Sequence, residues 1–277
     1  MPWFKTCFLL LLTSPAWALE NYALGLGIES DDADGTGVAG FADIGLNEDT
    51  RVSLLFGKTR IELLNEISLN TTFGDIGLDH YFDPVGIRAE LAYWGDNDIF
   101  DSVDWRGAVY WRNDTVSVSG DLEYRQFEFD IFRDDVLLGQ DIRFNAKGYG
   151  LSSRIRLNDR FSLSLRGINY DYNVDLRQNA DRRIINLLSI SRLSLINSLV
   201  SYRVSAGLGV NIGRSVLSFR VANWKGEIDG STSYSSTVKF LTPLGKTRDI
   251  EFGLGVDNSD VYESVVFLSV YLYFYGS

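Results

Sequence analysis

The sequence Ile250-Glu251-Phe252-Gly253-Leu254-Gly255-Val256-Asp257 alternates apolar residues with polar or small ones without a break. Because successive side chains of a β-strand point to opposite faces of its sheet, this segment predicts a strand with one apolar and one polar face. Segments 162–166 and 203–210 show the same alternation, and runs of about ten residues with this pattern recur from residue 36 to the end of the chain. The alternation predicts an all-β fold.

Residues 1–18 have the organisation of a cleavable secretory signal. Lys5 precedes the apolar run 7–12, and Ala16-Trp17-Ala18 supplies the small residues of a cleavage site. The run is too short to cross a membrane as a helix, although a membrane-anchoring helix is the alternative. Cleavage leaves residues 19–277 as a single exported domain without Cys7, the only cysteine. We therefore expect no disulfide, thiol nucleophile or cysteine-based metal site in the mature chain.

The composition narrows the possible partners. The formal net charge is −11, from 37 acidic and 26 basic residues, and this argues against a nucleic-acid partner, because nucleic-acid-binding proteins gather basic charge on one face. After residue 18, no segment approaches the roughly 20 apolar residues that a transmembrane helix needs. The 26 glycines and only 4 prolines suit a long hydrogen-bonded sheet with tight bends.

Short and long connections alternate between the predicted strands. The short ones are 47–50, 83–86, 112–114, 158–160, 212–214 and 244–247, and the longer, more acidic ones are 30–35, 58–66, 95–102, 130–139, 177–197, 225–230 and 257–260. Outer-membrane β-barrels have this asymmetry, with short turns on one side of the membrane and long loops on the other. The segments between the connections predict fourteen strands, with twelve as the alternative. The difference between the two counts lies in segments 21–29 and 67–82. In segment 67–82 the apolar parity changes between Phe73 and Ile76, which predicts either a bulge at Gly74 or a strand boundary.

The faces of the strands distinguish a membrane barrel from a soluble sandwich. A charged side chain on the lipid face near mid-bilayer costs about 2–4 kcal/mol, so charges of a membrane barrel should share one parity. In segments 87–94 and 103–112 they do, with Trp105 and Trp111 on the apolar face. The predicted interfacial aromatic residues near strand ends are Trp105, Trp111, Tyr170, Tyr172, Trp224 and Tyr234. The pattern favours a closed antiparallel transmembrane β-barrel over a sandwich.

The chain after residue 18 resembles bacterial outer-membrane β-barrel proteins as a broad class. The last segment, Val265-Val266-Phe267-Leu268-Ser269-Val270-Tyr271-Leu272-Tyr273-Phe274-Tyr275, is similar to the aromatic-rich C-terminal strand of such proteins. It departs from their pattern because Gly276 and Ser277 follow the aromatic residue. The resemblance implies a location in the bacterial outer membrane, contact with outer-membrane lipid and lipopolysaccharide, and recognition by the barrel-assembly machinery.

The polar face of the predicted barrel carries many arginines and fewer carboxylates. The expected lumen-facing residues are Arg88, Glu90, Asp104, Arg106, Arg112, Asp121, Glu123, Arg125, Arg154, Arg156, Arg166, Arg203, Arg220 and Glu251, and Arg143 is expected on the same face. One interpretation is a charged channel wall that attracts anionic or hydroxylated solutes, because guanidinium groups recognise carboxylates and phosphates. The other is mutual pairing of arginines and carboxylates that fills a narrow barrel. The run 121–125 facing 104–110 suits such pairing.

Catalytic and metal-binding patterns are weak. The only histidine, His80, stands near a short turn without the serine nucleophile that outer-membrane lipases place beside theirs. The run 30–35 has the acidic residues of a calcium loop but lacks the closing glutamate, which favours a solvated loop. Segment 177–197 is rich in aliphatic residues and could form a plug, a contact with lipopolysaccharide or an extension of two strands. We expect no cofactor and no metal.

Three functions remain open from the sequence. The first is a narrow porin-like passage for small polar or anionic solutes, which the arginine-rich lumen favours. The second is a closed structural barrel, or one associated with an envelope or secretion system, that transports nothing. The third is an outer-membrane enzyme that modifies lipid.

Overall fold

The computed structural model describes residues 21–62, 68–96, 100–130, 141–173, 199–227, 230–260 and 264–276. The predicted signal peptide and segment 177–197 lie outside these residues. The described chain forms fourteen antiparallel strands, which confirms the predicted number. They are β1 (Asn21–Asp31), β2 (Thr36–Gly45), β3 (Thr50–Glu62), β4 (Ser68–Tyr81), β5 (Val85–Asp96), β6 (Phe100–Arg112), β7 (Val116–Asp130), β8 (Asp141–Arg156), β9 (Phe161–Tyr172), β10 (Val200–Ile212), β11 (Ser215–Gly226), β12 (Thr232–Pro243), β13 (Arg248–Ser259) and β14 (Val265–Gly276).

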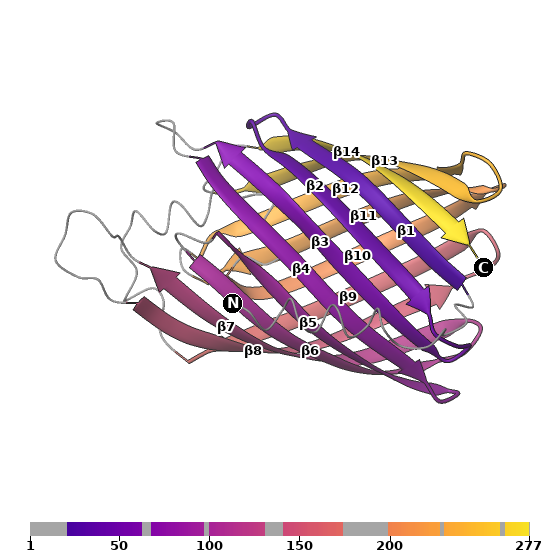
Figure 1. Ribbon diagram of the computed structural model, residues 1–277, viewed down its shortest axis with the longest axis horizontal. Coiled ribbons are helices and arrows are strands. Elements are labelled where there is room, and N and C mark those ends of the chain that lie inside the picture. Colours follow the sequence, from indigo (N-terminus) through magenta and orange to yellow (C-terminus); the bar gives the residue numbers. More distant parts are fainter. Residues whose placement is uncertain are drawn as a thin grey trace, which may run out of the picture.

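The strands close into a barrel in which each pairs with its neighbours in sequence and β14 pairs with β1. Figure 1 shows the indigo first strand beside the yellow last strand. Closure removes the unpaired edges that an open sheet would expose, so every strand has two hydrogen-bonded neighbours. The start of β1 and the end of β14 lie at the same end of the barrel as the short turns, because Tyr22 pairs with Gly276 and Asn21 pairs with Gly45, the last residue before the short turn between β2 and β3.

The register of the barrel fixes the slope of its strands. Following the paired residues once around the barrel leads back to β1 about 14 residues farther along that strand, so the shear is close to the strand number. With the usual strand spacing and rise, this gives a tilt of roughly 35° and a backbone diameter of roughly 26 Å. The interior is therefore wide enough to hold large side chains and still leave open space.

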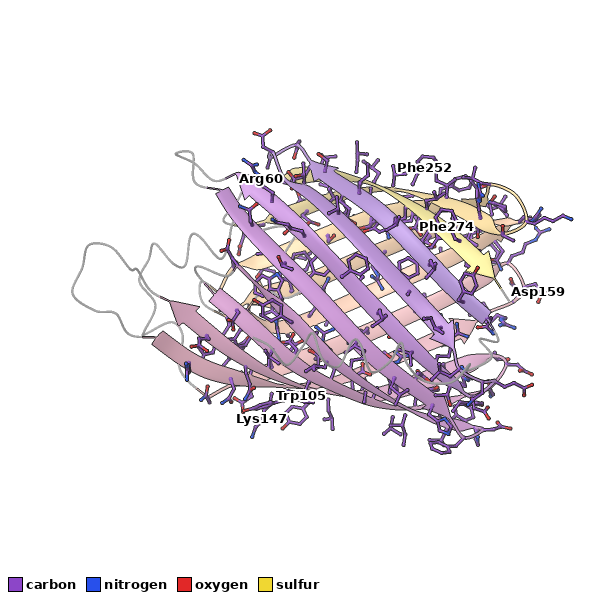
Figure 2. All side chains as sticks on the ribbon, viewed as in Figure 1. Arg60, Trp105, Lys147, Asp159, Phe252 and Phe274 are labelled. Atoms are coloured by element: carbon purple, nitrogen blue, oxygen red, sulfur yellow. The ribbon has the colours of Figure 1, made fainter. Side chains whose placement is uncertain are left out.

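The outer face of the barrel is apolar and the inner face is mixed. Leu26 and Leu151 are 60% and 70% exposed on the outside, as expected of side chains that face lipid in a membrane. Figure 2 shows Trp105 projecting away from the barrel wall. Phe127 and Ala146 have the opposite parity and are buried inside. No helix among the described residues is long and apolar enough to cross a membrane.

Strand β4 resolves the uncertain parity of segment 67–82. It runs without a register shift against both β3 and β5, so Gly74 forms neither a bulge nor a strand boundary. The apolar parity changes because Phe73 points inward, where its ring lies over Gly57. A Cβ atom on Gly57 would lie 2.2 Å from Cζ of Phe73, so only glycine leaves room for the ring.

Three of the residues predicted as interfacial aromatics lie inside the barrel instead. Trp105, Trp111 and Tyr234 are exposed on the outer face, which agrees with the prediction. Tyr170, Tyr172 and Trp224 have inward parity, and Trp224 is buried. The prediction was wrong for these three because proximity to a strand end does not specify the face, which depends on register.

Candidate functional site

An acidic and basic set of side chains lines the inside of strands β4–β7. Three direct cross-strand pairs place Asp79 opposite Arg88, Glu90 opposite Arg106, and Asp104 opposite Arg125. The shortest nitrogen–oxygen distances within these pairs are 2.9, 3.9 and 3.2 Å in the same order. We call these six residues the paired wall. From one pair to the next, the position moves by one strand around the barrel and by two residues away from the short turns. Acidic and basic side chains therefore alternate along one continuous line on the inner wall.

The paired wall is tightest at its far end from the short turns. The side chains of Asp104 and Arg125 are each 2% exposed. Asp104 also accepts a hydrogen bond from Ser102 Oγ at 2.5 Å and one from Arg106 Nη2 at 3.2 Å. The Arg125 guanidinium lies over the ring of Phe127, 4.9 Å from its centroid. Buried charges persist when they are paired and hydrogen-bonded, and Asp104 and Arg125 meet both conditions.

A second set of arginines follows on the next three strands with different neighbours. Arg154 on β8, Arg166 on β9 and Arg203 on β10 form what we call the arginine column. Directly across the strands, Arg154 faces Ser117 and Ser164, and Arg166 faces Ser152 and Ser205. Serines therefore stand where the paired wall has carboxylates, which leaves the column with excess positive charge.

The ends of the arginine column carry no ion pair with any described residue. Arg203 instead lies 5.6 Å from the ring centroid of Trp224. The middle member, Arg166, is 53% exposed and reaches Asp121 and Glu123 at 3.6 and 3.4 Å. Glu123 is already hydrogen-bonded by Tyr170 Oη at 2.7 Å. Among the described residues, Asp121 and Glu123 are the two carboxylates within ion-pair distance of the three arginines, so arginines outnumber their directly paired carboxylates in the column.

The arginine column runs parallel to the barrel axis. Arg154 is two residues from Ser152, the partner of Arg166, and Arg203 is two residues from Ser205, the other partner of Arg166. Each step therefore crosses one strand and advances two residues, a distance of roughly 8 Å between Cα atoms. The line from one arginine to the next makes an angle of roughly 36° with the strands. The barrel axis makes an angle of roughly 35° with the strands in the same direction, so the line of arginines is parallel to the axis.

Two cavities inside the barrel meet at Arg220 on β11. The first has a volume of about 350 Å³ and the second about 530 Å³, and Arg220 lines both. Among the predicted residues, the first is lined by Arg88, Glu90, Arg106, Asp121, Glu123, Arg125, Arg166, Arg203 and Arg220. The second is lined by Arg154 and Arg220, together with Glu29, Asp31, Asp257 and Lys239. The arginine column thus borders open space in both cavities.

The other predicted residues lie away from this space. Arg112 stacks over the Tyr81 ring, 3.8 Å from its centroid, at the end with the short turns. Arg156 is an exposed residue at the same end, and Glu251 is paired with Lys239 Nζ at 2.9 Å. Asp104 lies within the paired wall rather than at the cavity surface.

Arg143 is the one arginine assigned to the wrong face. It has the parity of the outward residues Tyr149 and Leu151, and it is 69% exposed while bonding Glu128 at 2.5 Å. The sequence predicts a loop over 130–139, and β8 begins with Asp141, so Arg143 stands only two residues into the strand. Near a strand end, lipid no longer excludes charge from the outer face, so charge alone does not indicate the inward side.

The sequence interpretation missed two inward carboxylates on β4. Asp75 lies 3.1 Å from Arg106 and Asp79 lies 2.9 Å from Arg88. The inward ring of Phe73 interrupted the apolar alternation of this strand and concealed the parity of both residues. The spacing of two residues between Asp75, Gly77 and Asp79 is the signal that could have found them. No group of residues suited to hold a metal ion occurs within the described ranges.

Comparisons with known proteins reach the fold only. No protein-family model and no curated protein matches the sequence. Among solved structures, a loop L8 deletion mutant of OmpT, an outer membrane protein of Vibrio cholerae, matches with a TM-score of 0.50 and 7% identity over 94% of this chain and 99% of that one. An anion-selective porin from Comamonas acidovorans matches with a TM-score of 0.49 and 10% sequence identity, over 94% of this chain and 99% of that one. The KdgM porin matches with a TM-score of 0.45 and 10% sequence identity, over 91% of this chain and 98% of that one.

The similarity to the OmpT variant agrees with the closed strand order of the barrel. The chain has the fold of bacterial outer-membrane β-barrel proteins, which confirms the class predicted from its sequence. At such low identity, the likeness carries no information about solute or partner. What the barrel does must be argued from its own interior.

Proposed function

We propose that the protein is an outer-membrane channel that passes small polar and anionic solutes. The observation that supports this most directly is the arginine column, whose ends have no ion pair among the described residues and which borders two cavities. Fixed guanidinium groups attract anions, and selectivity follows the charges that line the passage rather than the net charge of the protein. An anion preference is therefore compatible with the net charge of −11.

The proposed location is the outer membrane of a Gram-negative bacterium, reached by export with a cleavable signal at residues 1–18. The outward apolar residues support a lipid environment, because transferring the barrel to water would expose all of them. Lipid, lipopolysaccharide and the barrel-assembly machinery are the proposed partners during and after insertion.

A closed structural barrel is the second candidate, and the paired wall favours it. Its three arginines and three carboxylates form ion pairs with one another, so this part of the interior needs no solute to neutralise it. A barrel filled in this way throughout would conduct nothing. The arginine column and its cavities distinguish the two functions, because a structural interior gains nothing from arginines without carboxylate partners.

Conductance of the refolded protein in a planar lipid bilayer tests the proposal. We expect steady channels with a reversal potential that indicates anion preference in a salt gradient, weakening as ionic strength rises and screens the arginines. The double substitution Arg154→Gln with Arg203→Gln should reduce that preference. The matched control is Arg143→Gln, which removes an outward arginine and should leave selectivity unchanged. Silence in every condition supports the closed barrel, and cation preference refutes the assignment of the column.

A further inference from the structure

We propose that the arginine column binds extended oligoanions at two or three arginines simultaneously, with anionic groups about 8 Å apart along the pore axis. This inference rests on the proposed channel function and adds the class of solute. The solute is a chain or rod carrying at least two carboxylate or phosphate groups, rather than a single small anion.

The direction of the column is the first reason for this inference. Because Arg154, Arg166 and Arg203 are related by equal steps parallel to the axis, a solute that moves through the barrel meets them in order. Arginines arranged around the circumference would act on one anionic group at a single depth. Arginines arranged along the axis can bind successive groups of one elongated molecule.

The small residues on the inner wall beside the column are the second reason. Ser164 separates Arg154 from Gly207 on β10, and a Cβ atom on Gly207 would lie 2.6 Å from Ser164 Oγ. Only serines stand directly across the strands from Arg154 and Arg166, whereas Ile168 and Trp224 flank Arg203. A rod-like ligand can therefore lie against the part of the column formed by Arg154 and Arg166 without meeting a large side chain directly across from either arginine. Serine hydroxyls beside the column can donate to ligand oxygens that the arginines do not reach.

The middle arginine remains available to a ligand despite its carboxylate neighbours. Arg166 lies 3.4 Å from Glu123 and 3.6 Å from Asp121, both longer than the usual distance for a charge-assisted hydrogen bond. Tyr170, which lies on the same strand as Arg166, donates a hydrogen bond to Glu123 Oε2 at 2.7 Å, whereas Arg166 Nη2 faces the other oxygen, Oε1, at 3.4 Å. A guanidinium group has five N–H donors, so Arg166 can bind a ligand without releasing Glu123.

Simultaneous binding makes affinity depend on the length of the ligand. After one anionic group binds, the second binds as part of the same molecule, at a high effective concentration if the ligand spans the gap between arginines. Succinate and suberate carry the same charge but differ in length, and only suberate approaches the roughly 8 Å step. We expect suberate to block chloride current at about one tenth of the concentration that succinate requires.

Substitutions identify the arginines responsible. Arg166→Gln leaves Arg154 and Arg203 roughly 16 Å apart, too far for suberate to span, so the difference between succinate and suberate should disappear. The matched control is Arg220→Gln, which removes an arginine that is also exposed and lines both cavities but lies outside the column. It should weaken blockade by both anions equally and preserve their ratio. A heat-dependent shift in gel mobility verifies that each variant is folded.

The possible results separate this inference from the channel function. Equal blocking concentrations for succinate and suberate in the unsubstituted protein overturn the inference while anion-selective current still supports the channel. The inference is also overturned if the Arg220→Gln protein no longer distinguishes suberate from succinate, or if a folded Arg166→Gln protein still does. Absence of current or a cation preference refutes the channel and the inference together. If Arg166→Gln does not fold, Arg154→Gln and Arg203→Gln must each reduce the ratio.

Discussion

Replacing Arg125 with methionine should destabilise the barrel strongly, although Arg125 lies far from any lipid contact. The substitution keeps the apolar part of the side chain but leaves Asp104 without its direct cross-strand partner. Removing one partner of a buried ion pair costs about 3–5 kcal/mol, because the remaining charge stays buried. Asp104 keeps its hydrogen bonds from Ser102 and Arg106, so we expect the free energy of unfolding to fall by about 3 kcal/mol, near the lower limit of this range.

Urea unfolding of the refolded protein in detergent, followed by tryptophan fluorescence and circular dichroism, measures this loss. The matched control is Arg143→Met, since the pair of Arg143 and Glu128 is 69% and 39% exposed and should contribute less than about 1 kcal/mol. Combining Arg125→Met with Asp104→Asn should cost less than the sum of the two single changes, with a coupling energy of about 2 kcal/mol. Additive effects, or an Arg125→Met protein no less stable than Arg143→Met, would refute the energetic role of the paired wall.

Three further outcomes are expected. The mature chain should need detergent for solubility and shift in gel mobility on heating, because a closed barrel has no edge from which to unravel; full solubility in buffer would contradict the membrane assignment. Leu254→Arg should reduce insertion into vesicles, because a charge that faces lipid costs about 2–4 kcal/mol. Thr237→Arg places the charge on the cavity side and should insert normally. Tyr170→Phe should lower anion preference, because Glu123 then loses its hydrogen bond and can approach Arg166; an unchanged reversal potential would argue against this role of Tyr170.

The sequence predicted the fold well because a membrane barrel repeats one simple pattern. Outward positions must be apolar, and short turns must alternate with longer loops, so fourteen strands could be counted from residue types alone. The prediction failed locally where an inward aromatic ring covers a glycine, as Phe73 covers Gly57. Alternation reports the face of a residue only when the inner face is polar, and this interior contains large aromatic side chains.

The candidate site was less predictable, because it depends on register. Sequence parity assigned the charged residues to one face but could not say which strands place a carboxylate directly opposite an arginine. Arg106 and Arg125 were as plausible for solute contact as Arg166 and Arg203 until the cross-strand pairs were known. The structure shows that Arg106 and Arg125 are held by carboxylates, while serines stand opposite Arg166.

The turn between β8 and β9 has an electrostatic consequence beyond joining two strands. Asn158 Oδ1 accepts hydrogen bonds from the backbone N–H groups of Arg160 and Phe161 at 2.8 and 2.9 Å, which holds the turn in one conformation. If the hairpin slipped by two residues, every side chain would keep its face, but Arg154 would stand directly opposite Arg166, roughly 5 Å away instead of roughly 8 Å. The hydrogen bonds of Asn158 therefore help to keep Arg154 and Arg166 apart on the inner face, and a change in the length of this turn would alter the spacing of the two charges without replacing either arginine.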